Sequence, residues 1–191
     1  MTMTEIIGFA GSASTPSRTR TLVDMAVQMS AEKAGLTGTT FDLSDIGASL
    51  GTATRLVDLP TGPRDIIDRL VSAEALVVGS PVYKGSYSGL FKHLFDLIEP
   101  DALKGKPVLL TATGGGHRHA LIIEHQLRPL FGFFEAAVVA TGVYAASEDF
   151  ADGVPTTPAL MTRLDEAAAQ LASAVNATAP ARAHDLAHAA A

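Results

Sequence analysis

Short apolar runs recur along the chain between longer stretches in which apolar residues return at helical spacing. The runs cover residues 6–10, 39–43, 75–79, 108–112 and 136–143. This alternation predicts βα units around a parallel sheet, and therefore an α/β fold. Four of the runs are hydrophobic almost throughout, as strands buried on both faces require. The run at residues 39–43 is weaker, so we expect it at an edge of the sheet.

The stretches between the runs predict helices, two of which carry an ordinary one-sided stripe for packing on a core. The stripes comprise Leu22, Met25, Ala26 and Met29 in one stretch and Ile66, Ile67, Leu70 and Val71 in the other. Residues 87–98 are apolar over more of the helix surface than one stripe needs, so part of this helix is expected to face another subunit. Residues 117–134 contain Pro129 inside the helical pattern, which predicts an irregular turn near residues 125–129.

The length of 191 residues predicts a single domain, since one core commonly serves about 100 to 200 residues. We assign residues 1–175 to this domain. Residues 176–191 consist mainly of Ala, Pro, Arg and His with little to bury, so they are expected to form a disordered tail. Residues 43–61 show no clear period and are expected to form a surface loop.

Composition and charge exclude several classes of function. The chain has no Cys, which removes disulfides, thiolate nucleophiles and iron–sulfur clusters. The net charge of −6 repels a phosphate backbone, so nucleic acid is not an expected partner. No apolar run approaches the roughly 20 residues of a membrane span, and no basic segment precedes the first apolar run. We therefore expect a cytoplasmic protein that does not enter the membrane.

In an open α/β sheet, ligands bind beyond the carboxyl ends of the strands. The loop after the first strand reads Gly-Ser-Ala-Ser-Thr-Pro-Ser-Arg-Thr over residues 11–19 and leads directly into a helix. Hydroxyl groups, backbone N–H groups, the positive end of the helix dipole and Arg18 then converge, which favours a phosphate site. The alternative is a serine-rich helix cap without a ligand. Neither a Walker loop nor a Rossmann glycine fingerprint is present.

The loops after the third and fourth strands point to a planar ligand. Residues 79–89 contain Pro81, which fixes a turn, and Tyr83, which offers a flat amphipathic surface. Residues 113–116 read Thr-Gly-Gly-Gly, so bare backbone N–H groups are open to close approach. Three such loops at one sheet edge predict a ligand with a phosphate and a planar heterocycle. The group His117, Arg118, His119 and Glu124 lacks the spacing of a metal-binding helix motif, so no metal site is expected.

Three strings in these loops resemble the NAD(P)H-dependent FMN reductases of flavodoxin-like fold: GSxSxxSRT, SPVYKxxYSGxxKxxxD and TATGGG. The resemblance covers residues 4–172 and is nearest to the reductases of alkanesulfonate and methanesulfonate monooxygenase systems. It implies a three-layer sandwich with a five-stranded parallel sheet of order 2-1-3-4-5. Many relatives have Arg at the position of Ser14, so the hold on the phosphate is expected to depend more heavily on Arg18 here.

The resemblance also implies roles for individual residues. Ser12, Ser17, Arg18 and Thr19 would hold the FMN phosphate, and Pro81, Val82, Tyr83 and Lys84 would flank the flavin. Thr113, Gly114, Gly115 and Gly116 would contact the isoalloxazine ring. His125 falls where sulfonate-type reductases have Tyr or His in a one-residue helical insertion at a subunit interface.

The function expected from the resemblance is the transfer of hydride from NAD(P)H to FMN, with reduced FMN passed to a separate flavin-dependent monooxygenase. A homodimer or homotetramer is expected. Because the cofactors supply the reacting atoms, no catalytic side chain is expected, which agrees with the absence of a nucleophile or triad in the chain. Two alternatives stay open: a quinone or azo reductase that keeps its flavin, and a flavodoxin-like electron carrier. The preference for NADH or NADPH stays open as well.

Overall fold

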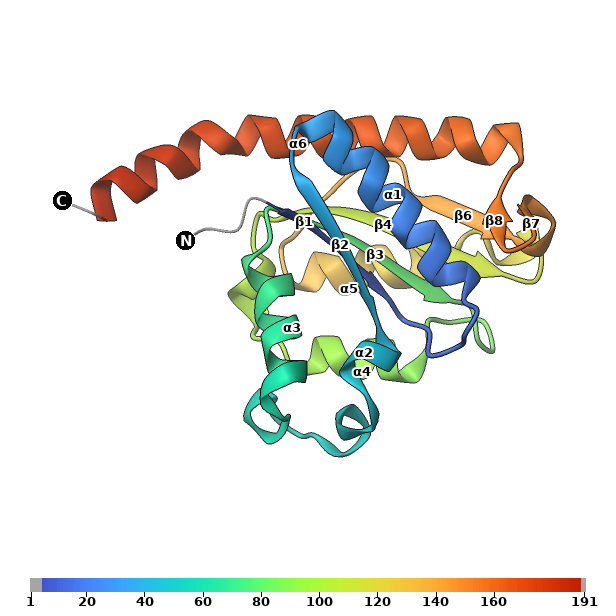
Figure 1. Cartoon of the computed structure of the whole chain (residues 1–191), viewed down its shortest axis with the longest axis horizontal. Coiled ribbons are helices and arrows are strands. Elements are labelled where there is room, and N and C mark those ends of the chain that lie inside the picture. Colours follow the sequence, from blue (N-terminus) through green and yellow to red (C-terminus); the bar gives the residue numbers. More distant parts are fainter. Residues whose placement is uncertain (1–4, 190–191) are drawn as a thin grey trace.

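A computed structural model describes residues 5–189 of the chain, and it places a parallel sheet between two layers of helices (Figure 1). The strands are β1 Glu5–Ala10, β2 Thr37–Asp42, β3 Ala75–Pro81, β4 Pro107–Gly114, β5 Ala137–Val138 and β6 Val143–Ala146. Their order is β2-β1-β3-β4, with β5 and β6 both paired to β4, and every pairing is parallel. The predicted fold class is confirmed, and the strand order is close to the predicted 2-1-3-4-5, with six strands in place of five within residues 5–189.

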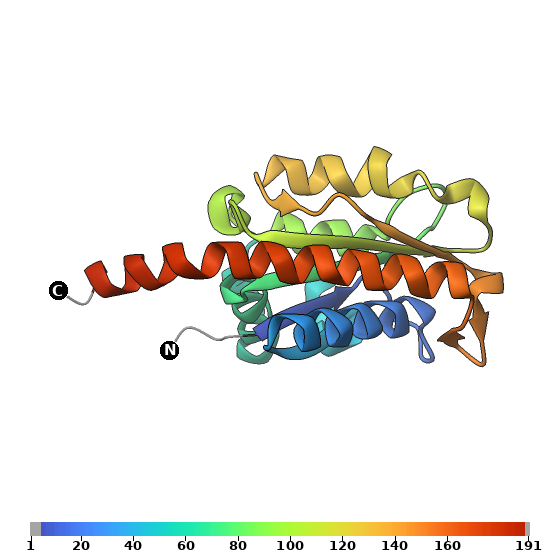
Figure 2. The same cartoon turned by 90° about the horizontal axis from the view of Figure 1, so that it is seen from above.

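Helices cover both faces of the sheet. They are α1 Arg18–Ala34, α2 Leu43–Ile46, α3 Thr61–Ser72, α4 Gly89–Asp96, α5 Arg128–Phe133 and α6 Pro158–Ala189. Helices α1 and α6 pack together over one face, around one cluster of buried residues (Figures 1 and 2). Helices α3, α4 and α5 pack on the other face, around a second and larger cluster. No helix in residues 5–189 is long and apolar enough to cross a membrane.

The predicted helical stripes lie against these clusters. In α1, Leu22 and Ala26 are fully buried, while Met25 and Met29 are partly buried at the edge of the same cluster. In α3, Ile67 and Leu70 form the buried face. The apolar excess predicted around residues 87–98 is mostly taken up by the core, because the chain bends after Asp96 and returns the following residues to the large cluster.

The predicted fifth strand is divided into two pieces, β5 and β6, rather than continuous over residues 136–143. Side chains from two helices bond the backbone of the intervening residues. Arg128 donates to the carbonyls of Val139 and Ala140, and Gln170 accepts from the N–H of Thr141. Because these groups are satisfied by side chains instead of by a neighbouring strand, the chain leaves the sheet here and re-enters at Val143.

Several other segments differ from or refine the expectation. Residues 43–61 are not one loop, since α2 is followed by 3-10 helices at Ala48–Thr52 and Leu56–Asp58. Further 3-10 helices lie at Pro100–Leu103, His117–His119 and Ser147–Asp149. The irregular turn predicted near residues 125–129 is confirmed as a π-helical turn at Ile123–Leu127, directly before α5.

The C-terminal segment is occupied by helix α6, which runs to Ala189 and whose last turns extend past the rest of the molecule (Figures 1 and 2). Alanine has the highest helix propensity, which favours a helix in this alanine-rich segment. The assignment of residues 1–175 to one domain and of residues 176–191 to a tail stays a prediction. A hairpin that the sequence analysis did not predict, β7 Phe150–Ala151 with β8 Val154–Pro155, precedes this helix.

Lys106 gives a pH dependence that can be measured. Its ammonium group donates to the carbonyl of Ala73 at the end of α3, and burial lowers its pKa from 10.5 to about 8. Between these two values the unfolded chain binds more protons than the folded chain, so the free energy of unfolding should rise with pH there. We expect Lys106→Met to flatten this rise in urea unfolding series; a wild-type and variant pair with equal slopes would contradict it.

Candidate functional site

A pocket of about 570 Å³ lies at the carboxyl edge of the sheet. The loop before α1, the ends of β3 and β4, and the tip of the β7–β8 hairpin form its walls. Its lining residues are Ser12, Ser14, Pro16, Ser17, Arg18, Thr19, Thr21, Pro81, Val82, Tyr83, Thr113, Gly114, Gly115, Asp152, Gly153 and Val154. Ten of the twelve residues predicted for the flavin site are therefore brought together, and the volume suits a small organic ligand.

Two serines of the pocket, Ser12 and Ser17, have hydroxyl hydrogens that are free to donate to a ligand. Ser17 is the N-cap of α1, and its hydroxyl oxygen accepts from the N–H of Arg20 at 3.1 Å. Ser12 is buried, and its hydroxyl oxygen accepts from the N–H of Ser14 at 3.2 Å. Because both oxygens act as acceptors, each hydroxyl hydrogen is left to donate to an anion. The first-turn N–H groups of α1 point the same way.

Arg18 and Arg20 stand two residues apart but have different roles. Arg20 bonds Asp42, Asp45 and the carbonyl of Thr40, so its N–H groups are occupied. Burial raises the pKa of Asp42, but hydrogen bonds from Ser44 and Arg20 outweigh it and hold this pKa below its usual value. Arg18 forms no ion pair or side-chain hydrogen bond with the described residues, and it is the one cation among those that line the pocket.

Thr19 and Thr113 join the phosphate loop to β4. Their hydroxyl oxygens lie 2.7 Å apart, and both side chains are buried. One hydroxyl donates to the other, so a single hydroxyl hydrogen of the pair is left for a ligand. Thr19 was predicted to hold the phosphate directly, whereas the structure also gives it a part in fixing the distance between α1 and β4.

The loop after β3 forms a tight turn that presents Tyr83. The N–H of Tyr83 donates to the carbonyl of Ser86, and the reverse bond is also made, so Lys84 and Gly85 are the two central residues. Their φ angles are 53° and 87°, which is typical of the type I′ turn of a hairpin. Tyr83 is 54% exposed and lines the pocket. Lys84 lies at the tip of the turn, outside the lining.

The three glycines after β4 have three different environments. Gly115 lines the pocket and has open space where a Cβ would point. Gly114 lies against the hydroxyl of Tyr144, which donates to the carbonyl of Gly116 at 2.6 Å. Burial, with a smaller effect of Asp149, raises the pKa of Tyr144 and keeps this donor protonated. Gly116 is not part of the lining, so only Gly114 and Gly115 of the predicted three reach the pocket.

The tip of the β7–β8 hairpin, residues 152–154, forms a wall of the pocket that was not predicted from the sequence. The dipeptide Asp152-Gly153 is a recognised hairpin turn signal, and both residues have positive φ. Each strand has only two residues, which is too short for an alternating pattern to be seen. No three His, Asp or Glu side chains in the described part of the chain are grouped to hold a metal ion.

FMN fits this pocket by the chemistry of its lining. One end offers hydroxyl donors, a helix N-terminus and an unpaired guanidinium, which suit a phosphate. The other end offers Pro81, Val82, the ring of Tyr83 and bare backbone at Gly115, which suit a flat heterocycle.

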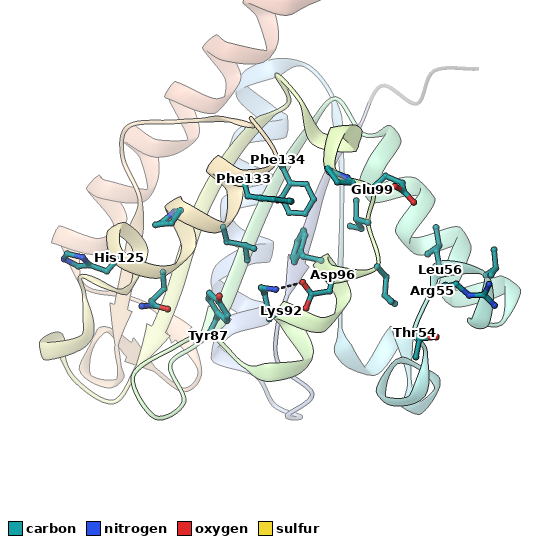
Figure 3. A pocket seen from close by; sticks show the side chains of 18 residues that line it. Thr54, Arg55, Leu56, Tyr87, Lys92, Asp96, Glu99, His125, Phe133 and Phe134 are labelled. Atoms are coloured by element: carbon teal, nitrogen blue, oxygen red, sulfur yellow. Dashed lines mark hydrogen bonds and ion pairs between the residues drawn. The ribbon is translucent and has the colours of Figure 1, made fainter.

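A larger hollow of about 960 Å³ lies on another part of the surface, between α4, the π-helical turn and α5 (Figure 3). Its walls are mainly apolar, with Tyr87, Phe133 and Phe134 among them, and one ion pair joins Lys92 to Asp96 (Figure 3). His125 lies at this hollow rather than at the flavin pocket. Size alone does not identify the reactive site here, since the groups suited to bind phosphate are in the smaller pocket.

Comparison with known proteins decides the family. The family model described as NADPH-dependent FMN reductase matches residues 4–151. The chain belongs to this family. An NADH-dependent FMN reductase of Pseudomonas fluorescens, SfnF, is 42% identical over 168 residues, which are 88% of this chain and 90% of that protein. An FMN reductase (NADPH) of Pseudomonas aeruginosa is 44% identical over 146 residues, or 76% of this chain and 78% of that protein.

Two solved structures of oxidoreductases have the same fold. An oxidoreductase from Corynebacterium diphtheriae is 36% identical and superposes with a TM-score of 0.82, covering 92% of this chain and 98% of that chain. The apo form of the NADH:FMN oxidoreductase EMOB is 26% identical with a TM-score of 0.76, covering 89% of each chain. The predicted enzyme class, an oxidoreductase of the FMN and NAD(P)H type, is confirmed at the level of this family.

The two adjacent glycines allow a matched test of this FMN reductase site. Gly114→Ala places a methyl group against the Tyr144 hydroxyl, so we expect a loss of about 1–3 kcal/mol in the free energy of unfolding. Gly115→Ala meets no atom within 4 Å, so it should keep the wild-type stability while weakening flavin binding. Urea unfolding and flavin titration of both variants check this. The opposite order of stabilities would contradict the assigned environments.

Proposed function

We propose that this chain uses NAD(P)H to reduce FMN and releases the reduced FMN to a separate flavin-dependent monooxygenase. The observation that carries the proposal is the unpaired Arg18 at the start of α1, in the same pocket as the exposed face of Tyr83. These two groups support the binding of a phosphate at Arg18 and of a planar ring at Tyr83 in one pocket. The relatives are named for FMN reduction with NADH in one case and NADPH in another, so both donors belong in the tests.

In this proposal the protein binds and orients, and bound FMN supplies the redox chemistry. Arg18, the hydroxyl of Ser17 and the start of α1 hold the phosphate and so fix the position of the ligand along the pocket. Pro81 and Val82 present a rigid apolar wall, because the N–H of Val82 is bonded to the carbonyl of Thr113 at 2.8 Å. This wall and the hairpin tip reduce the access of water to the ring.

The pocket also suits a ligand that leaves after each turnover. Tyr83 is 54% exposed and is the one aromatic side chain in the described lining, so the ring is stacked on one side only. A reductase that supplies reduced flavin to a partner needs this modest affinity. Because the reaction draws on NAD(P)H, we place it in the cytoplasm.

We expect NAD(P)H oxidation to increase with added FMN and to saturate, with riboflavin a poorer substrate because it lacks the phosphate. Arg18→Ala should raise the KM for FMN by about tenfold to a hundredfold, as loss of a charge-assisted hydrogen bond implies, and change the KM for riboflavin little. Absorbance at the nicotinamide band measures both. Lys104→Ala, which removes an exposed cation outside both the pocket and the hollow, is the matched control.

The results also separate the alternatives. Equal losses for FMN and riboflavin in Arg18→Ala would contradict the phosphate assignment. FMN that stays bound through gel filtration, together with faster reduction of quinones or azo compounds, would favour a flavin-retaining reductase. Bound flavin without any nicotinamide oxidation would favour an electron carrier.

We further propose a homodimer or homotetramer assembled through the hollow near the π-helical turn. Two of its apolar lining residues are largely exposed, Phe133 at 66% and Val57 at 65%, and His125 lies beside the same hollow (Figure 3). Burial of this apolar surface between subunits would stabilise the assembly. Light scattering should give a multiple of 19.8 kDa, and Phe133→Glu should reduce it. A wild-type mass of one chain would refute the proposal.

A further inference from the structure

The β7–β8 hairpin is held firmly beside the flavin pocket by one buried carboxylate. Asp149 is 8% exposed and accepts from the N–H of Ala146 and from the hydroxyl of Thr157, both at 2.7 Å. The carbonyl of Asp149 also accepts from the N–H of Thr156 at 2.9 Å. Both ends of the hairpin are therefore fixed to the end of β6 and the start of α6.

This anchoring fixes the position of Phe150, the first residue of β7, next to Arg18. The guanidinium carbon of Arg18 lies 5.7 Å from the centre of the Phe150 ring. Phe150 is partly buried against the cluster that α1 and α6 share, so its ring does not move freely. Contact with an aromatic face at this distance is attractive for a cation.

The kind of contact matters because it leaves the hydrogen-bonding groups of Arg18 unused. A guanidinium stacks through its face, whereas its five N–H donors point outward in its plane. A carboxylate partner would occupy those donors, as Asp42 and Asp45 do for Arg20. Phe150 can therefore restrict Arg18 without competing with a phosphate.

The position of the Arg18 guanidinium matters more for phosphate binding than the net charge of the pocket does. The described lining holds one cation, Arg18, and one carboxylate, Asp152, so its formal charges cancel. An exposed arginine with no partner also loses side-chain entropy when it binds a ligand. A contact that already restricts Arg18 lowers this loss.

From these observations we infer that Phe150 is the positioning residue for Arg18 and that it sets the preference of the pocket for flavins that carry a phosphate. The inference rests on the proposed function in one respect, which is that Arg18 binds the FMN phosphate. Phe150 itself touches no reacting atom.

The test is a binding measurement without nicotinamide, in which FMN and riboflavin are titrated by quenching of flavin fluorescence. Phe150→Leu keeps an apolar side chain but removes the ring, so the Kd for FMN should rise about threefold to tenfold and the Kd for riboflavin less than twofold. Phe150→Tyr keeps the ring and should bind both flavins as the wild type does. Riboflavin binding by Phe150→Leu reports that the pocket is intact.

A double variant distinguishes an effect of Phe150 that depends on Arg18 from a general effect of Phe150 on the shape of the pocket. In the Arg18→Ala background, Phe150→Leu should cause no further loss of FMN affinity, since the interaction partner is already gone. Independent losses that add together would overturn the inference. Equal weakening of FMN and riboflavin by Phe150→Leu, or a Phe150→Tyr variant as weak as Phe150→Leu, would also overturn it.

The result for Arg18→Ala distinguishes failure of the proposed phosphate site from failure of the role of Phe150. If Arg18→Ala weakens FMN selectively but Phe150→Leu does not, the role of Phe150 is overturned and the proposed phosphate site stands. If Arg18→Ala binds FMN as tightly as the wild type, the phosphate site and the role of Phe150 are both overturned.

Discussion

Helices α1 and α4 pack closely against the carboxyl ends of the strands because the strand residues that their side chains contact are glycines. A Cβ at Gly11 would overlap the ring of Phe91, and one at Gly79 would overlap Val23 and Thr111. The N–H of Gly11 donates to the carbonyl of Gly79 at 2.7 Å, and this bond joins the loop after β1 to the end of β3. The position of the α1 N-terminus, and with it the whole phosphate end of the pocket, follows from this close approach.

The sequence predicted the parts of the fold that depend on local pattern. Buried strands and helix stripes repeat over many residues, and the three strand-end loops each carry their own signal. The division of the last strand could not be predicted, because it depends on Arg128 and Gln170 reaching residues 139–141 from two helices. The extent of α6 is also hard to predict, because a low content of large apolar residues argues against structure while alanine's helix propensity argues for a helix.

The pocket could be predicted in part. Residues of the three predicted loops line one pocket, whereas the hairpin that forms the remaining wall could not be predicted, since its short strands show no alternating pattern. Lys84 and Gly116 were included by motif, but a turn directs the first outward, and the second gives its carbonyl to Tyr144. Of two adjacent residues in one motif, one can thus line the pocket while the other stabilises the fold around it.

The π-helical turn and the divided strand depend on each other. Arg128 follows this turn, is paired with Glu124 inside it, and bonds the carbonyls of Val139 and Ala140. Removal of one residue from Ile123–Leu127 would rotate Arg128 by about 100° around the helix axis and carry it away from both carbonyls. A single deletion in this turn would therefore change two elements at once, since a regular helix here would leave the carbonyls at the edge of the sheet without their donor.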